Sequence, residues 1–284
     1  MLLTAAAERL GTVAGSAARL EAELLAAQAA GVSRAGLLAQ VRAPMAPQAR
    51  AAFKAAVGRR EAGEPLAYVL GRAPFLDFEV RVTPAVLVPR PETELLAEWA
   101  IGQVRRNASG GSPLTVLDVG TGSGVLAIAI ARACPAALVV GTDTSGAALA
   151  IATDNARAHG LAARVALLQA DLWPPGPTAF DIVVANLPYV ATDELADVAP
   201  DVLAWEPHAA LFAGRDGLAL LARFAAGITA RLGAGGAVGL EVGWRQAAAV
   251  ERMLIAALPD HAVTSLPDDA GIQRLVVATP SGSP

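Results

Sequence analysis

The sequence predicts an α/β protein in which a small helical domain precedes a seven-stranded sheet. Two patterns support this prediction. From Leu114 onward, apolar strand-like runs alternate with helical patterns, which is typical of parallel βα units with helices on both faces of the sheet. The last two runs are separated only by the short link Asp268 to Ile272, so the parallel part is predicted to end in an antiparallel hairpin.

The first part of the chain has the residue spacing of a helical domain. From Leu2 to about Leu70, leucines and alanines recur every three to four residues, with breaks at glycines and prolines. Residues 1–72 are therefore predicted to form a small helical domain. A chain of 284 residues, of which 54% are hydrophobic, is long enough to form this domain beside a larger core.

A β-hairpin is predicted to join the two domains over residues 73–90. Apolar residues alternate from Phe75 to Val82, and a second apolar run, Val86-Leu87-Val88, follows Pro84. These two runs are the expected strands of the hairpin.

The second domain is predicted over residues 91–284. It opens with a helix at Pro91-Glu92-Thr93-Glu94, because proline and acidic residues are favoured in a first helical turn. The polar, glycine-rich segment 107–113 is expected to be a loop. The predicted strands that follow span residues 114–120, 137–143, 164–170, 180–186, 236–242, 262–267 and 273–278.

The composition argues against several classes of protein. A formal net charge of −4 and a pI near 5.4 give no broad basic field, so we expect no direct nucleic-acid partner. Cys134 is the single cysteine and the three histidines are scattered, which disfavours a disulfide scaffold and a metal site. Charged residues interrupt the N-terminal apolar stretch, and no internal stretch is long enough to span a bilayer. We expect a soluble, cytoplasmic monomer with no membrane partner.

A glycine-rich loop follows the first predicted strand of the sheet. The apolar run ends in Gly120-Thr121-Gly122-Ser123-Gly124, and a helical pattern begins at Val125. Glycines let the backbone turn tightly and approach a ligand, and the first amides of a helix are free to bind it. Taken by itself, the pattern fits a nucleotide-like ligand and a mere tight strand-to-helix connection equally well.

Acidic residues end the next two predicted strands. Asp143 closes the second strand, where a carboxylate can accept hydrogen bonds from ribose hydroxyls; the alternative is a cap for the helix that starts at Ser145. Asp171 ends the third strand, where it can accept a hydrogen bond from the amino group of adenine while Leu172 packs on the ring. The alternative is a solvated turn before Pro174. Two acids after consecutive strands favour adenosyl binding over isolated turns.

The segment Asn186-Leu187-Pro188-Tyr189 ends the fourth predicted strand and indicates transfer to a planar nitrogen. A carboxamide nitrogen is a poor nucleophile, so an enzyme must hold its NH2 group with acceptors, which Asn186 Oδ1 and the Leu187 carbonyl can supply. Pro188 restricts Leu187 to an extended backbone, and Tyr189 is expected to stack on the flat substrate. The alternative is a strand that ends at proline with a polar cap. Because ligands gather at the carboxyl ends of parallel strands, this segment and the glycine loop are expected to face one crevice.

Other polar segments have simpler explanations. Trp205-Glu206-Pro207 is typical of a turn, Gly214 to Gly217 of a helix entry, and Glu241-Val242-Gly243 of a strand exit. Arg90 and Glu92 are candidates to line the crevice, but an exposed helix start explains them equally well.

Taken together, these motifs resemble the HemK/PrmC family, the glutamine N5-methyltransferases that modify class 1 peptide chain release factors. The likeness covers nearly the whole chain, and its most discriminating part is the string Pro89-Arg90-Pro91-Glu92-Thr93-Glu94. The other matching segments are Glu64 to Gly71 with Phe75, Asp118 to Gly124, Glu206-Pro207 with Ala210-Leu211, Gly214 with Asp216 to Leu218, and Leu240-Glu241 with Gly243.

The resemblance implies a Rossmann-like methyltransferase domain that binds S-adenosylmethionine. It also implies that the glutamine of a release factor's Gly-Gly-Gln loop lies against Asn186, Leu187, Pro188 and Tyr189 and attacks the sulfonium methyl group in line, without a metal. The N-terminal helices are the expected docking surface for that protein. The residues implied to bind the cofactor are Gly120, Thr121, Gly122, Ser123, Gly124, Asp143, Asp171, Leu172 and Asn186.

The chain departs from the family pattern at one position of this motif. The family has Asn-Pro-Pro-Tyr, whereas this chain has Leu187 in place of the first proline. The required acceptor is a backbone carbonyl, which leucine keeps, so we expect retained activity. Three alternatives stay open: methylation of another planar amine or amide, such as DNA adenine or a ribosomal protein glutamine; an inactive adenosyl-binding module; and a nicotinamide dehydrogenase, which leaves Asn-Leu-Pro-Tyr unexplained.

Overall fold

The computed structural model describes residues 2–39, 44–107 and 113–282, so most of the loop predicted over 107–113 lies outside the described residues. By their internal contacts the residues form two compact units. The first comprises Met1–Arg72 with Ala199–Trp205, and the second comprises Ala73–Val198 with Glu206–Pro284.

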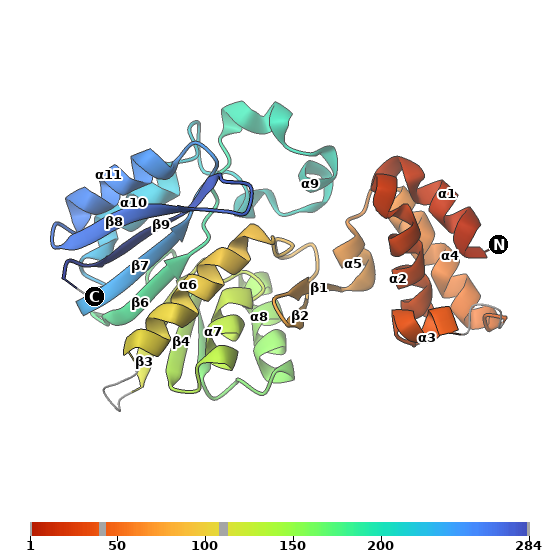
Figure 1. Cartoon of the computed structure of the whole chain (residues 1–284), viewed down its shortest axis with the longest axis horizontal. Coiled ribbons are helices and arrows are strands. Elements are labelled where there is room, and N and C mark those ends of the chain that lie inside the picture. Colours follow the sequence, from red (N-terminus) through yellow and green to blue (C-terminus); the bar gives the residue numbers. More distant parts are fainter. Residues whose placement is uncertain (1, 40–43, 108–112, 283–284) are drawn as a thin grey trace. The chain divides into compact units, whose positions relative to one another are not determined.

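The first unit is helical (Figure 1). Leu10, Leu25, Phe53 and Val57 are buried in its core, and the buried Arg60 guanidinium lies 2.8 Å from a carboxylate oxygen of Glu21. The unit also includes a short helix from the second half of the chain, α9. Its helices are α1 (Leu2–Ala14), α2 (Ala18–Ala30), α3 (Arg34–Ala39), α4 (Pro47–Glu61), α5 (Leu66–Leu70) and α9 (Pro200–Trp205).

The second unit contains the predicted seven-stranded sheet, in the order β5-β4-β3-β6-β7-β9-β8. Strands β3 to β7 pair in parallel. Strand β9 pairs antiparallel with both β7 and β8, which confirms the predicted hairpin at the end of a parallel run. The strands are β3 (Leu114–Val119), β4 (Ala137–Asp143), β5 (Val165–Gln169), β6 (Phe180–Ala185), β7 (Leu232–Glu241), β8 (His261–Pro267) and β9 (Gln273–Pro280).

Helices cover both faces of this sheet (Figure 1). On one face, Leu117 and Val183 pack with Phe224 and Leu254 of α10 and α11. On the other face α6 lies so close to β7 that a Cβ atom added at Gly239 would overlap the Trp99 ring. The helices are α6 (Glu92–Asn107), α7 (Val125–Ala133), α8 (Gly146–Ala158), α10 (Ala219–Ile228) and α11 (Ala247–Ala257), with 3-10 turns at Thr192–Asp197 and His208–Ala210.

The predicted hairpin exists, but its strands differ from those expected. The two strands are β1 (Arg72–Phe75) and β2 (Phe78–Arg81), joined by a tight turn in which Leu76 has a positive φ of 49°. The prediction that Val86-Leu87-Val88 forms the second strand is wrong. This segment lies between two prolines, and the Val88 N–H donates to the Glu206 carboxylate at 3.1 Å instead of to a strand.

The described residues contain neither a membrane-spanning helix nor a cluster of metal-binding side chains. None of the helices there is long and apolar enough to cross a membrane. The same residues contain no group of three or more His, Cys, Asp or Glu side chains that could hold a metal ion.

Candidate active site

The glycine loop is a sharply turned backbone segment between β3 and α7. Gly120, Gly122 and Gly124 all have positive φ, at 75°, 55° and 81°, a region that residues with a Cβ atom seldom adopt. The N–H groups of Gly120 and Thr121 both donate to the Thr142 carbonyl at 2.8 Å, which anchors the turn to β4. The loop therefore presents backbone rather than side chains.

A buried acid lies beneath this loop. Asp118 at the end of β3 is fully buried, and its Oδ2 accepts hydrogen bonds from the Thr121 hydroxyl at 2.6 Å and the Ala127 N–H at 3.2 Å. Its other oxygen has no partner among the described residues. Burial raises the pKa of Asp118 to about 6, since the two hydrogen bonds and the nearby Asp143 change it less. Asp118 thus ties the loop to the start of α7.

A cavity of about 450 Å³ opens at the carboxyl ends of the central strands, within the second unit. This volume lies in the range of about 300–1,000 Å³ that is common for small-molecule sites. Gly124 and Tyr189 are not among its lining residues, although both were predicted for the site. The predicted residues that do line it are Gly120, Thr121, Gly122, Ser123, Asp143, Asp171, Leu172, Asn186, Leu187 and Pro188.

Asp143 stands at the cavity wall with both carboxylate oxygens oriented by backbone amides. Its Oδ2 accepts from the Gly122 N–H at 3.0 Å, and its Oδ1 accepts from the Ser145 N–H at 2.8 Å. The cap of α8 is Ser145, whose hydroxyl accepts from the Ala148 N–H. A carboxylate has about four acceptor positions, so Asp143 keeps acceptor capacity for a ligand in the cavity.

Asp171 and Leu172 lie on another wall of the cavity in different environments. Asp171 forms an exposed ion pair with Arg223, at 2.8 Å. Leu172 is buried and has a positive φ of 62°, a rare conformation for a residue with a Cβ atom. The Thr142 hydroxyl donates to the Leu172 carbonyl at 2.8 Å and fixes this turn, so the leucine side chain is part of the cavity wall.

Asn186 and Leu187 follow the end of β6 and face the glycine loop. The Asn186 Nδ2 donates to the Thr93 hydroxyl at 3.0 Å. Leu187 is buried, and its Cδ2 lies 3.1 Å from the place where a Cβ atom would stand at Gly120. A glycine at 120 is therefore needed both for the turn and for the close approach of Leu187.

Tyr189 does not line the cavity in this structure. Its hydroxyl donates to the Glu241 carboxylate at 3.3 Å, and its carbonyl accepts from Gln246 Nε2 at 2.8 Å. Burial raises the pKa of the Tyr189 hydroxyl, and the neighbouring Glu241 adds to this. Gly217 lies directly against the Tyr189 carbonyl, where any Cβ atom would overlap it, so the Gly214 to Gly217 segment packs on this motif.

Four residues that sequence reasoning left aside or valued little lie beside the predicted ones. Arg90 lines the cavity, and its Nη2 contacts the buried Glu206 carboxylate at 2.6 Å. Thr93 lines the cavity and bonds Asn186, while Glu241 bonds Tyr189. All four belong to motifs that resemble the family, so the motifs could have indicated these residues. Their hydrogen-bond partners could not be predicted in this way, because they lie more than 50 residues away in the sequence.

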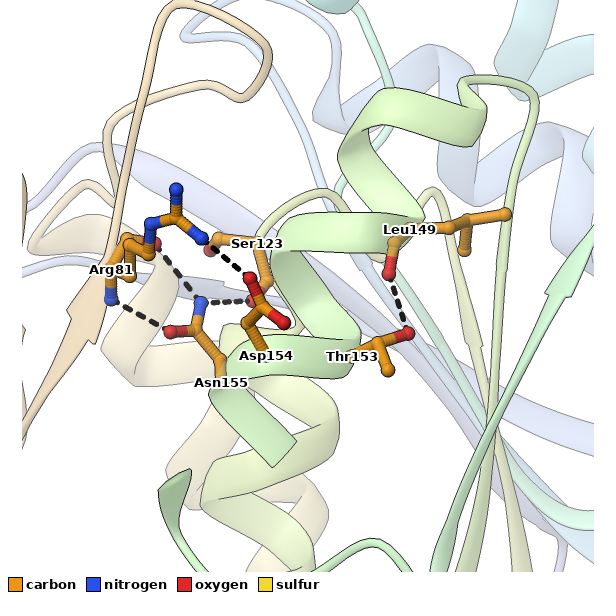
Figure 2. A network of polar contacts seen from close by, with 6 residues as sticks. All are labelled: Arg81, Ser123, Leu149, Thr153, Asp154 and Asn155. Atoms are coloured by element: carbon orange, nitrogen blue, oxygen red, sulfur yellow. Dashed lines mark hydrogen bonds and ion pairs between the residues drawn. The ribbon is translucent and has the colours of Figure 1, made fainter. Parts of the chain in front are cut away.

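Asn155 of α8 is a further residue that sequence reasoning missed (Figure 2). Its side chain accepts from the Arg81 N–H at 2.8 Å and donates to the Arg81 carbonyl at 3.0 Å. It also donates to the Ser123 carbonyl of the glycine loop at 2.9 Å. One buried amide thus connects the end of β2 to the loop, and no spacing in the sequence signals it.

Two family models match parts of the chain. The family model of the PrmC N-terminal domain matches residues 1–71, and the model of ribosomal protein L11 methyltransferase (PrmA) matches residues 96–211. A solved 16S rRNA methyltransferase of T. thermophilus, in complex with AdoMet and guanosine, shares the fold, with a TM-score of 0.51 and 21% identity over 74% of this chain and 50% of that chain.

Two relatives of nearly full length are much closer in sequence. The release factor glutamine methyltransferase of Bordetella pertussis is 44% identical, over 90% of this chain and 93% of that protein. The protein of the same name from Cereibacter sphaeroides is 40% identical, over 97% of this chain and 96% of its own length. The chain belongs to the release factor glutamine methyltransferase family.

Proposed function

We propose that this protein transfers a methyl group from S-adenosylmethionine to the side-chain nitrogen, N5, of the glutamine in the Gly-Gly-Gln motif of class 1 peptide chain release factors. The observation that carries the proposal is the position of Asn186 and Leu187. Both line the cavity together with the glycine loop and Asp143, so an amide-binding motif faces a nucleotide-type site.

The residues of the cavity fit S-adenosylmethionine. Asp143 has acceptor capacity left for ribose hydroxyls, and its two oxygens are already oriented by backbone amides. Gly120 and Gly122 carry no side chain that would fill the space beside the loop. Leu172 supplies an apolar surface on which adenine can pack, and Asp171 can accept a hydrogen bond from the adenine amino group.

Asn186 and Leu187 bind and orient the substrate amide. Bound S-adenosylmethionine supplies an electrophilic methyl group, which the amide nitrogen receives. The Asn186 Oδ1 and the Leu187 carbonyl accept hydrogen bonds from the substrate NH2 and aim the nitrogen lone pair. These two acceptors also stabilise positive charge as it develops on the nitrogen, so they lower the energy of the transition state more than that of the bound substrate.

The proposed site of action is the cytoplasm, where translation occurs. The helical residues 1–72 are proposed to dock the protein substrate. Docking predicts that an intact release factor has a KM at least about tenfold below that of a short peptide with the Gly-Gly-Gln sequence, since extra contacts of about 1.4 kcal/mol give a factor of ten. Steady-state kinetics on the full chain measures both values. Equal KM values would contradict the docking role and leave the methyl transfer unaffected.

Mass spectrometry of a purified, unmethylated release factor tests the main proposal. After incubation with the protein and S-adenosylmethionine, we expect one added methyl group on the Gly-Gly-Gln glutamine, and none with the Asn186→Ala variant. A ribosomal protein incubated in parallel tests the alternative that the acceptor is a ribosomal protein glutamine. This alternative is included because residues 96–211 match the model of ribosomal protein L11 methyltransferase. Cofactor binding without transfer to the release factor would refute the proposed substrate.

A further inference from the structure

Asn155 of α8 is a buried carboxamide, both polar atoms of which have hydrogen-bond partners (Figure 2). The residue is 3% exposed. Its Oδ1 accepts from the Arg81 N–H at 2.8 Å, and its Nδ2 donates to the Arg81 carbonyl at 3.0 Å and to the Ser123 carbonyl at 2.9 Å. A reversed amide would place its oxygen against two carbonyl oxygens, which cannot donate. The two bonds to Arg81 therefore fix the plane of the amide and direct its remaining N–H to the glycine loop.

The glycine loop needs such contacts to keep one conformation. Glycine adopts positive and negative φ with similar ease, so peptide groups next to glycines can rotate at low cost. The peptide group between Ser123 and Gly124 is held at both ends. The Gly124 N–H donates to the Thr121 carbonyl at 2.8 Å, and the Ser123 carbonyl accepts from Asn155. Asn155 thus selects one orientation of a peptide group that glycine leaves free to turn.

Helix α8 contacts the next residue of the loop as well. A Cβ atom added at Gly124 would lie 3.1 Å from the Cβ atom of Ala152, which is three residues before Asn155 and so on the same face of the helix. Ser123 lines the cavity, whereas Asn155 and Ala152 are not among its lining residues. An effect of Asn155 on a ligand in the cavity must therefore pass through the loop.

We infer that Asn155 is a positioning residue for the cofactor site, which holds the Ser123 end of the glycine loop in the conformation that binds S-adenosylmethionine. This inference rests on the proposed use of the cavity for that cofactor. When only a fraction of a protein has the binding conformation, the apparent affinity falls by that fraction. Loss of the Asn155 bond should therefore weaken cofactor binding, while Asn186 and Leu187 keep their acceptors for the substrate.

Three successive residues of α8 provide matched variants (Figure 2). Asn155→Asp nearly keeps the shape of the side chain and removes both donated hydrogen bonds. Asp154→Asn removes an exposed ion pair with the Arg81 side chain. Thr153→Val removes the hydrogen bond from the Thr153 hydroxyl to the Leu149 carbonyl at 2.7 Å. Neither of the last two contacts involves the loop, so both variants control for the loss of a polar contact in the same helix.

Calorimetric titration with S-adenosylmethionine, without a methyl acceptor, tests the inference. The dissociation constant should rise about tenfold in Asn155→Asp and less than about twofold in Asp154→Asn and Thr153→Val. At saturating cofactor, kcat on a Gly-Gly-Gln peptide should fall less than about threefold in all three variants, because the substrate side of the cavity is unchanged. Wild-type cofactor affinity in Asn155→Asp would overturn the inference, and so would an equal loss of affinity in all three variants.

NMR on the wild-type protein tests the inference even if Asn155→Asp does not fold. The Asn155 side-chain NH2 protons should exchange slowly with solvent, and their signals should shift when S-adenosylmethionine binds, because the amide contacts the loop. Rapid exchange, or signals that ignore the bound cofactor, would contradict the positioning role. If the wild type binds no S-adenosylmethionine, the proposed cofactor and this inference both fail. If it binds the cofactor but methylates no release factor, only the proposed substrate fails, and the cofactor affinities still decide on Asn155.

Discussion

The two sides of the cavity are built in different ways. On the loop side, the wall is one continuous run from Gly120 to Ser123, shaped by glycines with positive φ. On the side of Asn186, the wall depends on side chains from separate elements, because Asn186 after β6 is held by a hydrogen bond to Thr93 of α6. These two residues lie 93 positions apart in the sequence.

Because of this difference, the two sides of the cavity tolerate different kinds of substitution. A backbone wall depends on conformations that only glycine adopts cheaply, so it is sensitive to any added Cβ atom. A side-chain wall depends on the direction of hydrogen bonds, so it is sensitive to exchanges of donor and acceptor that leave the shape unchanged. A buried acid with a raised pKa lies near each side, Asp118 under the loop and Glu241 against the Tyr189 hydroxyl.

The largest effect is expected from Asn186→Ala, which removes an oriented acceptor from the side-chain wall. Turnover should fall about 100- to 1,000-fold, as for the loss of one oriented group that stabilises a transition state. The dissociation constant of S-adenosylmethionine, measured by calorimetry, should change less than about threefold because the loop side is intact. Asn186→Asp, of nearly the same shape, is the matched control for packing. An equal loss of turnover and cofactor affinity would mean that Asn186 mainly serves the cofactor.

Asp118→Asn tests the acid under the loop. Its folded-state pKa of about 6 lies above the ordinary value of an aspartate, so the folded protein binds the extra proton between about pH 4 and 6. The resulting stability is present at low pH and is lost as the pH rises through about 6, a change on the order of 3 kcal/mol. Urea unfolding at pH 4.5 and 7.5 should show a smaller pH dependence in the variant. Identical pH dependence in both proteins would refute the raised pKa. Glu241 contributes in the same direction up to about pH 7, so part of the dependence should remain.

Gly120→Ala should damage the backbone wall more than an equally strained position elsewhere. A Cβ atom at Gly120 meets Leu187, whereas one at Gly160, with nearly the same φ, meets nothing within 4 Å. Both variants should lose about 1–2 kcal/mol of stability from the positive φ. Only Gly120→Ala should also weaken S-adenosylmethionine binding, by about tenfold, or 1.4 kcal/mol. Thermal unfolding and calorimetry measure the two effects. Equal cofactor affinity in both variants would show that the close approach of Leu187 is unimportant.

The smallest effect on turnover is expected from Leu187→Pro, which restores the family pattern. The acceptor is the carbonyl of this residue, so turnover should change less than about tenfold, or 1.4 kcal/mol. The buried leucine side chain packs in the core, so its loss should lower the free energy of unfolding by about 1–3 kcal/mol. Steady-state kinetics and urea unfolding test both parts. A gain of turnover beyond tenfold would show that the rigid proline, and not the carbonyl alone, is needed.

Much of the fold could be predicted because its signals are local. The strands of the sheet follow from apolar runs of four to eight residues, and the predicted bounds of β3, β4, β6 and β9 differ from the structure by no more than two residues. The start of β7 lies four residues earlier than predicted, at Leu232, because glycines in its first half give no strand signal. The second hairpin strand is β2 and not Val86 to Val88, because an apolar run cannot reveal that the Val88 N–H bonds Glu206.

The direction of side chains at the site could not be predicted in the same way. Tyr189 was expected to stack on the substrate, yet its hydroxyl is directed to Glu241 and it does not line the cavity. Glu241 was interpreted as a strand exit, although it is almost fully buried. Both outcomes depend on which residues of β7, α6 and the segment after β6 become neighbours, which the order of strands in the sheet decides.

The α/β class, the family, the glycine loop and the segment Asn186 to Tyr189 could be predicted from the sequence, because periodicity, glycine conformation and motif spacing depend on residues that are close together along the chain. Tertiary packing was needed to show that Asn186 donates to Thr93, that Tyr189 donates to Glu241, and that Asn155 joins β2 to the loop. The physical reason is that a hydrogen bond requires two groups within about 3 Å. Only the packing of strands and helices brings residues so distant in sequence that close together.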